Sequence, residues 1–356
     1  MSRAVEIPLV RLGAVLALVL AAAVGLGLAL GPLARSPAFR EPAQGRVAEG
    51  VYLDIDGERI ELGGLRPYEA CGLLEDSASR WSVPARDAYI DRRTGGVVPA
   101  LDGRRLDVAA TVAAAVAAAP GQAIKPVFYP VPPLVGLADF PEAPVYSGNR
   151  AKNEVAVVLN VAWGDEFLEH ILATVEGAGG RLTICPVGQW LDADAGRAAW
   201  LAEAAARGHE IGNHGYYNRP MTYSAAKVKD ELDRTAALIR QACGRQPAVF
   251  APPMGEFNQT TLAAASAAGY RTVLWSLDTI DWRREGVDVI AGRVTSRVKP
   301  GDIILCHPTD QTAAAMREFL PVLAAQGLRL VTVSELLSPE LPPGATPTGQ
   351  PPEPGR

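Results

Sequence analysis

The chain has 356 residues, of which 48% are hydrophobic, and a formal net charge of −5 at pH 7. This length allows two or three domains, and a mildly acidic chain without a Lys/Arg block argues against a nucleic-acid-binding surface. The cysteines are widely spaced and form no CxxC pair, so buried thiols are favoured over a disulfide framework; they are Cys71, Cys185, Cys243 and Cys306.

Residues 12–34 form an uncharged apolar run that follows Arg3 and Arg11. A helix of this length can cross the hydrocarbon core of a bilayer. Because no clean Ala-x-Ala site follows, residues 1–36 are predicted to be an uncleaved signal anchor, with a cleaved signal peptide and a secreted protein as the alternative. The basic N-terminal side predicts a single-pass protein of the cell membrane whose domains lie outside the cytoplasm.

Residues 47–135 are predicted to form a small α+β module. Residues 51–58 favour a hairpin with a turn at Asp56-Gly57, and residues 67–80 and 108–118 favour helices. The opening DG and LGGL, the Gly95-Gly96 turn and the segment GRRLD at 103–107 resemble peptidoglycan-binding modules found in front of cell-wall enzymes. A spacer that holds the next domain away from the membrane is the alternative.

The remainder of the chain divides into three parts. Residues 136–153 are a Pro-rich linker, predicted to be extended, and the Pro-rich tail 339–356 is predicted to be disordered. Between them, residues 154–338 alternate strand and helix patterns, which indicates a parallel α/β sheet or barrel. Strands are predicted at 155–161, 182–186, 248–251, 272–276, 302–306 and 330–333, and helices at 167–178, 195–207 and 224–243.

The stretch GHEIGNHGYYN, residues 208–218, holds two of the four histidines and follows an Ala-rich helix. It is typical of a short strand that ends in a turn at the rim of an α/β sheet, where function concentrates. His209 is interpreted as structural, whereas His214 is a candidate ligand. One histidine alone cannot hold a metal, since such sites need three or more protein ligands.

Several collinear motifs carry a resemblance to a known family. They are GHEIGNHG, FAPPMGEFN at 250–258, LWSLDTIDW at 274–282, PGDIILCH at 300–307 and the closing VTVSELL. Residues 154–338 therefore resemble the polysaccharide deacetylase family (NodB homology domain, carbohydrate esterase family 4). The resemblance implies a distorted (β/α) barrel with its site at the carboxyl ends of the strands, and removal of acetyl groups from N-acetylated glycans.

In this family an Asp and two His bind a divalent ion, usually zinc, which polarises the acetyl carbonyl and activates water. A second Asp, held by an Arg, is the general base, and a late His paired with an Asp is the general acid. Carried over by motif, the base falls on Ala162, the metal Asp on Trp163, the second metal His on Asn218 and the Arg on Ala251. Of the metal ligands only His214 remains.

The last two motifs keep more of the family's chemistry. His307 stands at the general-acid position and Asp281 at its partner, while Leu305 and Trp282 keep their substrate-side positions. His307 and Asp281 are the predicted catalytic pair. The alternative is a hydrogen-bonded His–Asp pair that only braces adjacent strand ends.

A displaced metal site is a second alternative. Asp165 and Glu166 follow Trp163 closely and, with His214 and Asn218, offer an oxygen-rich ligand set. However, Asp165 precedes an apolar helix and is favoured as its N-cap, and Glu166 suits the first turn.

Aromatic residues near the same rim are predicted to contact substrate by stacking on sugar rings; they are Trp163, Tyr217 and Trp282, with Tyr216 beside them. The alternative is that they fill the mouth of an inactive cleft.

Two functions therefore compete. One is a cell-wall protein that resembles polysaccharide deacetylases but has little or no metal-dependent activity, and binds glycan or peptidoglycan without a cofactor. The other is an active peptidoglycan deacetylase with a rearranged zinc site. The losses at Ala162, Trp163, Asn218 and Ala251 favour the first.

Overall fold

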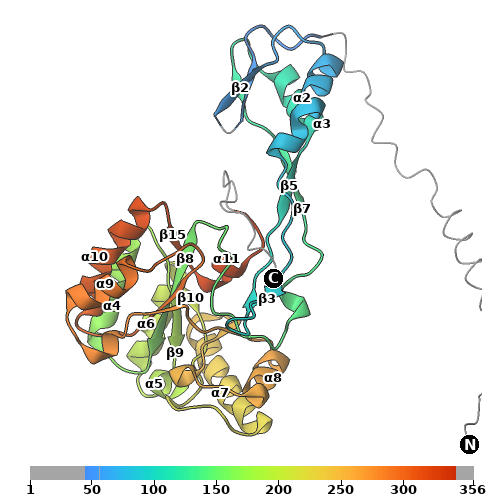
Figure 1. Cartoon of the computed structure of the whole chain (residues 1–356). Helices are drawn as coiled ribbons and strands as arrows, with labels where there is room; N and C mark the ends of the chain where they lie inside the picture. Colours follow the sequence, from blue (N-terminus) through green and yellow to red (C-terminus); the bar gives the residue numbers. More distant parts are fainter. Residues whose placement is uncertain (1–44, 56, 342–356) are drawn as a thin grey trace, which may run out of the picture. The chain divides into compact units, whose positions relative to one another are not determined.

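The computed structural model describes residues 45–55 and 57–341 (Figure 1). Within these ranges no helix is both long and apolar enough to cross a membrane. The predicted signal anchor and most of the predicted tail lie outside them. The chain divides into two compact units, whose described parts are residues 45–76 with 108–127 and residues 77–107 with 128–341.

The first unit is a small α+β structure. Strands β1 (Tyr52–Ile55) and β2 (Glu58–Glu61) are antiparallel with Ile55 opposite Glu58, and Gly57 has a φ of 82°, as the predicted hairpin requires. Strand β6 (Ala123–Ile124) pairs with β1 in parallel. Helices α2 (Pro67–Trp81) and α3 (Val108–Ala117) close the core, and Leu53 and Leu74 are fully buried.

The predicted module 47–135 is divided between the two units. The second unit takes β3 (Tyr89–Ile90), β4 (Val97–Val98), β5 (Gly103–Leu106) and β7 (Phe128–Val131). The physical reason is long-range backbone pairing, because Val97 N donates to Pro144 O and Asp102 N donates to Pro339 O. The predicted linker 136–153 is likewise built into this unit: Val145 is buried and pairs with Val273 in parallel.

The second unit is built on a parallel sheet. Its strands are β8 (Glu154–Val161), β9 (Thr183–Pro186), β10 (Glu210–Ile211), β13 (Leu277–Asp278), β14 (Ile303–Cys306) and β15 (Arg329–Val331). They run in the order β10-β9-β8-β14-β13, with β15 also paired to β8. Strands β11 (Val249–Phe250) and β12 (Arg271–Thr272) pair in parallel, and a bridge from Asn213 to Phe250 connects them to β10. The predicted parallel α/β architecture is confirmed.

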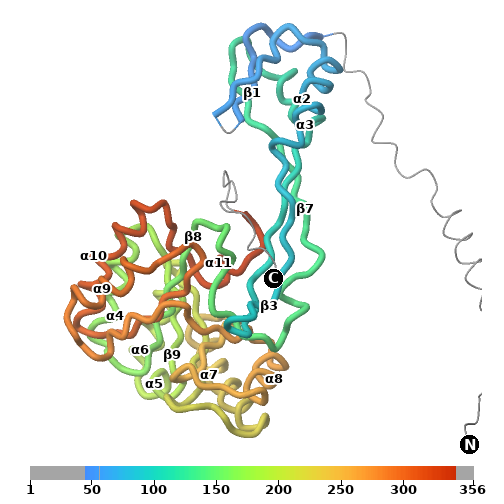
Figure 2. Tube along the Cα trace, in the orientation of Figure 1, coloured from blue at the N-terminus to red at the C-terminus, as the bar shows by residue number. Residues whose placement is uncertain are grey.

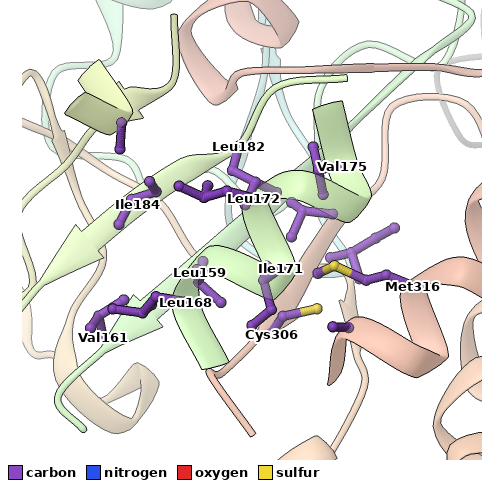
Figure 3. Packing of buried hydrophobic residues seen from close by; sticks show 14 of the residues in the cluster. Leu159, Val161, Leu168, Ile171, Leu172, Val175, Leu182, Ile184, Cys306 and Met316 are labelled. Carbon is purple, nitrogen blue, oxygen red and sulfur yellow. The ribbon is translucent and has the colours of Figure 1, made fainter. Parts of the chain in front are cut away.

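Helices follow the strands, as the trace in Figure 2 shows. They are α4 (Asp165–Gly177), α5 (Gly188–Asp192), α6 (Ala195–Ala206), α7 (Ala225–Cys243), α8 (Gln259–Ala267), α9 (Val287–Thr295), α10 (Thr312–Ala325) and α11 (Val333–Leu337). Alternate residues of β8 face opposite sides. Leu159 and Val161 pack with Ile171 of α4 (Figure 3), whereas Ala156 and Val158 belong to a separate cluster with Val249 and Ile303.

The cysteines agree with the prediction of free thiols. All four are unpaired, and Cys185 and Cys306 are fully buried in β9 and β14. Burial raises the pKa of the Cys185 thiol far above its usual range, which makes this sulfur unreactive.

Candidate functional site

The candidate site is at the carboxyl edge of the parallel sheet. Trp163 follows β8, His214 follows β10, Ala251 follows β11 and His307 follows β14. Because these strands are parallel, their carboxyl ends meet at one edge, so positions far apart in sequence come together. The direct contacts are His214 with Ala251 and Trp163 with His307.

His214 is held in a single neutral form. His214 is only 3% exposed, and its Nδ1 is 2.6 Å from the carbonyl oxygen of Ala251. A carbonyl can only accept, so Nδ1 carries the hydrogen and Nε2 keeps its lone pair. Burial, with a smaller contribution from nearby His307, lowers the pKa of His214 to about 4. This nitrogen therefore has the protonation state that a metal ligand needs.

The loop that carries His214 is fixed by helix α7. Oε2 of the buried Glu231 accepts from Tyr216 N and Tyr217 N at 3.3 Å each. Thr235 Oγ1 donates to Gly215 O at 2.9 Å. Glu231 and Thr235 are polar residues at positions of the otherwise apolar buried face of α7. This placement was the sequence signal that could have identified them. The loop is thus positioned by hydrogen bonds from the protein itself.

His307 and Asp281 form the predicted pair. Asp281 is fully buried, and its carboxylate lies 2.9 Å from His307 Nδ1 while accepting from His307 N at 2.7 Å. Thr312 Oγ1 donates to the same carboxylate at 3.0 Å. The indole of Trp163 lies nearly parallel to the imidazole of His307, at 9° with ring centroids 6.2 Å apart. The geometry matches the family's acid pair, whereas its catalytic use stays a prediction.

Asp165 is not the N-cap of helix α4. Gly164, not Asp165, occupies the N-cap of α4, with a φ of 83°. The Asp165 carboxylate accepts from Trp190 Nε1 and from Arg197 Nε, each at 2.6 Å. The N-cap prediction was wrong because the left-handed turn at Gly164 moves the helix start by one residue.

The residues present do not fit the family's metal. Of the three ligand positions, Trp163 and Asn218 carry an indole and an exposed amide, so only His214 offers a suitable nitrogen. Across residues 45–55 and 57–341, no three His, Cys, Asp or Glu side chains converge as a potential metal site. Asp165 is engaged with Trp190 and Arg197 rather than grouped with His214. A catalytic zinc site keeps three protein ligands, and this donor set does not supply them.

A cavity of about 600 Å³ lies beside these substituted positions. Its lining includes Ala162, Trp163 and Asn218 together with Gln189 and Trp190. Sequence reasoning missed the last two. Their signal was position, because the segment GQWLD directly follows β9 at the same sheet edge. Arg197 also lines the cavity and places its guanidinium 5.1 Å from the Trp190 ring.

The other predicted substrate contacts are spread along the rim. Trp282 is 51% exposed and Leu305 is only 3% exposed. Tyr217 is half-buried and lies under the guanidinium of Arg219 at 4.2 Å. Of the predicted aromatic contacts, Trp163 is the one that lines the cavity.

The second unit is thus a parallel α/β sheet whose carboxyl edge carries two histidines, His214 and His307. Residues 147–273 match the family model for polysaccharide deacetylase. The chain belongs to the polysaccharide deacetylase family. This agrees with the resemblance noted in the motifs, and with the expected NodB-type fold of the second unit.

Two relatives illustrate the likeness. An uncharacterized Bacillus subtilis protein, YlxY, is 36% identical over 59% of this chain and 66% of its own length. A peptidoglycan-N-acetylglucosamine deacetylase of Bacillus cereus is 39% identical over 36% of this chain and 64% of its own length. These two alignments therefore span just under two thirds of each relative.

Among solved structures, a CE4 family pseudoenzyme from Bacillus anthracis is 30% identical, with a TM-score of 0.67 over 76% of this chain and 95% of that one. A mutant of that pseudoenzyme is described as having restored enzymatic activity.

Proposed function

We propose that this protein is a cell-wall glycan-binding member of the polysaccharide deacetylase family that lacks metal-dependent deacetylase activity. The proposal places its ligand, a peptidoglycan-type glycan, at the carboxyl edge of the parallel sheet. It also keeps the predicted N-terminal anchor, which would hold the protein on the outer side of the cell membrane.

One observation carries the proposal. The positions of the base and of two metal ligands are occupied by Ala162, Trp163 and Asn218, and all three line the same cavity of about 600 Å³. Ala251 takes the position of the base-orienting arginine and presents a carbonyl to His214 instead of a charge. The substitution of the base and that of the arginine are expected to occur together, because an arginine left without its carboxylate partner would be an uncompensated charge.

The cavity is suited to a sugar. Its volume lies within the range of small-molecule sites, and the exposed indole of Trp163 gives an apolar face against which a pyranose ring can pack. Gln189 and Asn218 supply amide donors and acceptors for hydroxyl and acetamido groups. The relatives named as peptidoglycan deacetylases support peptidoglycan as the glycan.

The test combines metal analysis with activity and binding. The full-length protein, kept in solution by a non-ionic detergent without a sugar headgroup, is assayed for zinc content, for acetate release from N-acetylglucosamine oligomers, and for binding of the same oligomers. We expect no stoichiometric zinc, no acetate release, and binding that weakens in Trp163→Ala. Trp282→Ala and Tyr217→Ala test the outer rim in the same assay.

An active enzyme is the second candidate, favoured by the intact His307–Asp281 pair. Stoichiometric zinc together with acetate release that disappears in His307→Ala would establish it. In that case the ligands would have to be rearranged from the family's positions.

A further inference from the structure

A second cavity lies toward the opposite edge of the sheet, between the β3–β4 hairpin and the segments that precede β8 and β13. Its volume is about 180 Å³. Its polar lining consists of Asp91, Arg93, Thr94, Ser147, Arg150 and Ser276. No residue with a role in the proposed glycan site contributes to it.

Positive charge predominates in this lining. Asp91 is the one carboxylate among the lining residues, and its oxygens already accept from Arg93 N at 2.9 Å and from Thr94 Oγ1 at 3.2 Å. The guanidinium of Arg93 approaches Asp91 only to 3.8 Å, and its side chain is 80% exposed. Within the described part of the chain, Arg93 therefore lacks a close acceptor for its side-chain hydrogens.

Among the described residues, the guanidinium of Arg150 is anchored through only one of its three nitrogen atoms. Its Nη1 donates to Pro300 O at 2.8 Å and to Asp302 Oδ1 at 2.6 Å. Asp302 is buried and also accepts from Ser276 Oγ at 2.7 Å, so this end of the guanidinium is well fixed. Its Nε and Nη2 hydrogens find no acceptor in the ranges that the structure describes.

The floor of the cavity is preorganised as well. The hairpin turn is closed by Gly95 N donating to Asp91 O at 2.7 Å, and Gly96 packs so closely on the Tyr146 ring that a Cβ would lie 2.5 Å from it. Tyr146 and Trp275 add aromatic walls to the lining. A bound molecule would therefore meet the anchored guanidinium of Arg150, the exposed guanidinium of Arg93 and a flat apolar surface.

We propose that this cavity binds the carboxylate or phosphate group of a molecule about the size of a monosaccharide. A guanidinium group can donate two hydrogen bonds to a pair of oxygens of either anion, and charge-assisted hydrogen bonds of this kind are roughly twice as strong as neutral ones. A cavity of 180 Å³ is smaller than the usual site for a drug-sized ligand, which limits the ligand to one ring. The aromatic walls receive that ring.

Calorimetric titration of the full-length protein with glucose 6-phosphate, D-glucuronate and glucose tests the proposal. We expect both anions to bind and glucose not to bind. Arg93→Gln should weaken anion binding by about tenfold or more, the loss expected for one charge-assisted hydrogen bond. The tighter of the two anions identifies whether the natural ligand carries a phosphate or a carboxylate.

Arg92 provides the matched control, because it is exposed in the same turn and does not line the cavity. Arg92→Gln removes the same charge and should leave binding unchanged. The proposal is overturned if neither anion binds at millimolar concentration, if glucose binds equally well, or if the two variants weaken binding alike. Because the glycan site lies at the other edge of the sheet, Trp163→Ala should leave these titrations unchanged.

Discussion

At the residue scale, the two rim histidines are both held through Nδ1 but by different partners. His214 binds a backbone carbonyl and is buried, whereas His307 binds a carboxylate and has a side chain 20% exposed. Consequently His214 resists protonation, whereas His307 is hydrogen-bonded to the carboxylate of Asp281. The same edge thus keeps one buried imidazole with a free lone pair and one His–Asp hydrogen bond, while Ala162, Trp163 and Asn218 occupy the positions of the family's base and other ligands.

Folding stability should depend on pH through His214. Its folded pKa of about 4 lies below the usual value of 6.5, so the unfolded chain takes up the proton first. The contribution of His214 is complete above pH 6.5 and falls as the pH drops toward 4. Between about pH 7 and pH 5 we expect a loss of about 2 kcal/mol.

The free energy of unfolding from denaturant titration at these two pH values measures the loss. His209, also buried with a lowered pKa, acts in the same direction and is present in both proteins compared. In His214→Gln the fall should therefore be smaller than in the wild type by about 2 kcal/mol. An equal fall in both proteins would contradict the protonation state assigned to His214.

Asp281 is the second residue whose surroundings make a clear prediction. Its buried carboxylate accepts from His307 N, His307 Nδ1 and Thr312 Oγ1. Asp281→Ala removes the acceptor of both His307 donors, whereas Thr312 Oγ1 keeps the carbonyl oxygen of His307 at 2.7 Å. We expect a loss of about 3 to 5 kcal/mol in the free energy of unfolding. Asp310→Ala, which removes an exposed pair with Arg284, should cost less than about 1 kcal/mol. Equal costs would contradict the account.

At the element scale, the histidine loop depends on α7. Glu231→Ala removes the acceptor for Tyr216 N and Tyr217 N, which should cost about 1 to 3 kcal/mol of unfolding free energy. Asp233→Ala on the same helix removes only an exposed pair with Lys229 and should cost less than about 0.5 kcal/mol. If Glu231→Ala were as mild as the control, the loop would have another anchor.

Helix α4 offers a pair of glycines with opposite expectations. Gly164 has a φ of 83°, and a Cβ there would lie 2.1 Å from Pro308 O, so Gly164→Ala should destabilise by about 2 kcal/mol or more. Gly177 lies at the end of the same helix with open space around it. Gly177→Ala should be neutral or stabilise by up to about 1 kcal/mol. Melting temperatures of both variants test the assignment.

The same elements explain what the sequence could and could not predict. The strands 155–161 and 302–306 were predicted to within one residue because both segments are largely apolar. The His307–Asp281 pair was predicted because both residues fall on motif positions. The partners of Asp165 were missed, since Trp190 and Arg197 come from later elements. Val145 was assigned to a linker because its pairing with Val273 depends on tertiary contacts. Local pattern does not encode such long-range partners.

At the scale of the whole molecule, a family fold carries an altered site. The second unit keeps the parallel sheet, the covering helices and the motif order of polysaccharide deacetylases, and it resembles a CE4 family pseudoenzyme over most of that protein's length. Packing of the core does not require the ligands or the base, so the fold can persist when they are substituted. The glycan binding proposed for this edge can persist as well, because the cavity and its aromatic wall do not depend on an ion.

The most direct test of the central claim compares acetate release by the wild type with that of the variant that restores the family's residues: Ala162→Asp, Trp163→Asp, Asn218→His and Ala251→Arg. Both proteins are assayed with added zinc on N-acetylglucosamine oligomers. The account predicts no zinc-dependent release by the wild type and measurable release by the restored variant. Zinc-dependent release by the wild type, abolished by a chelator, would contradict it.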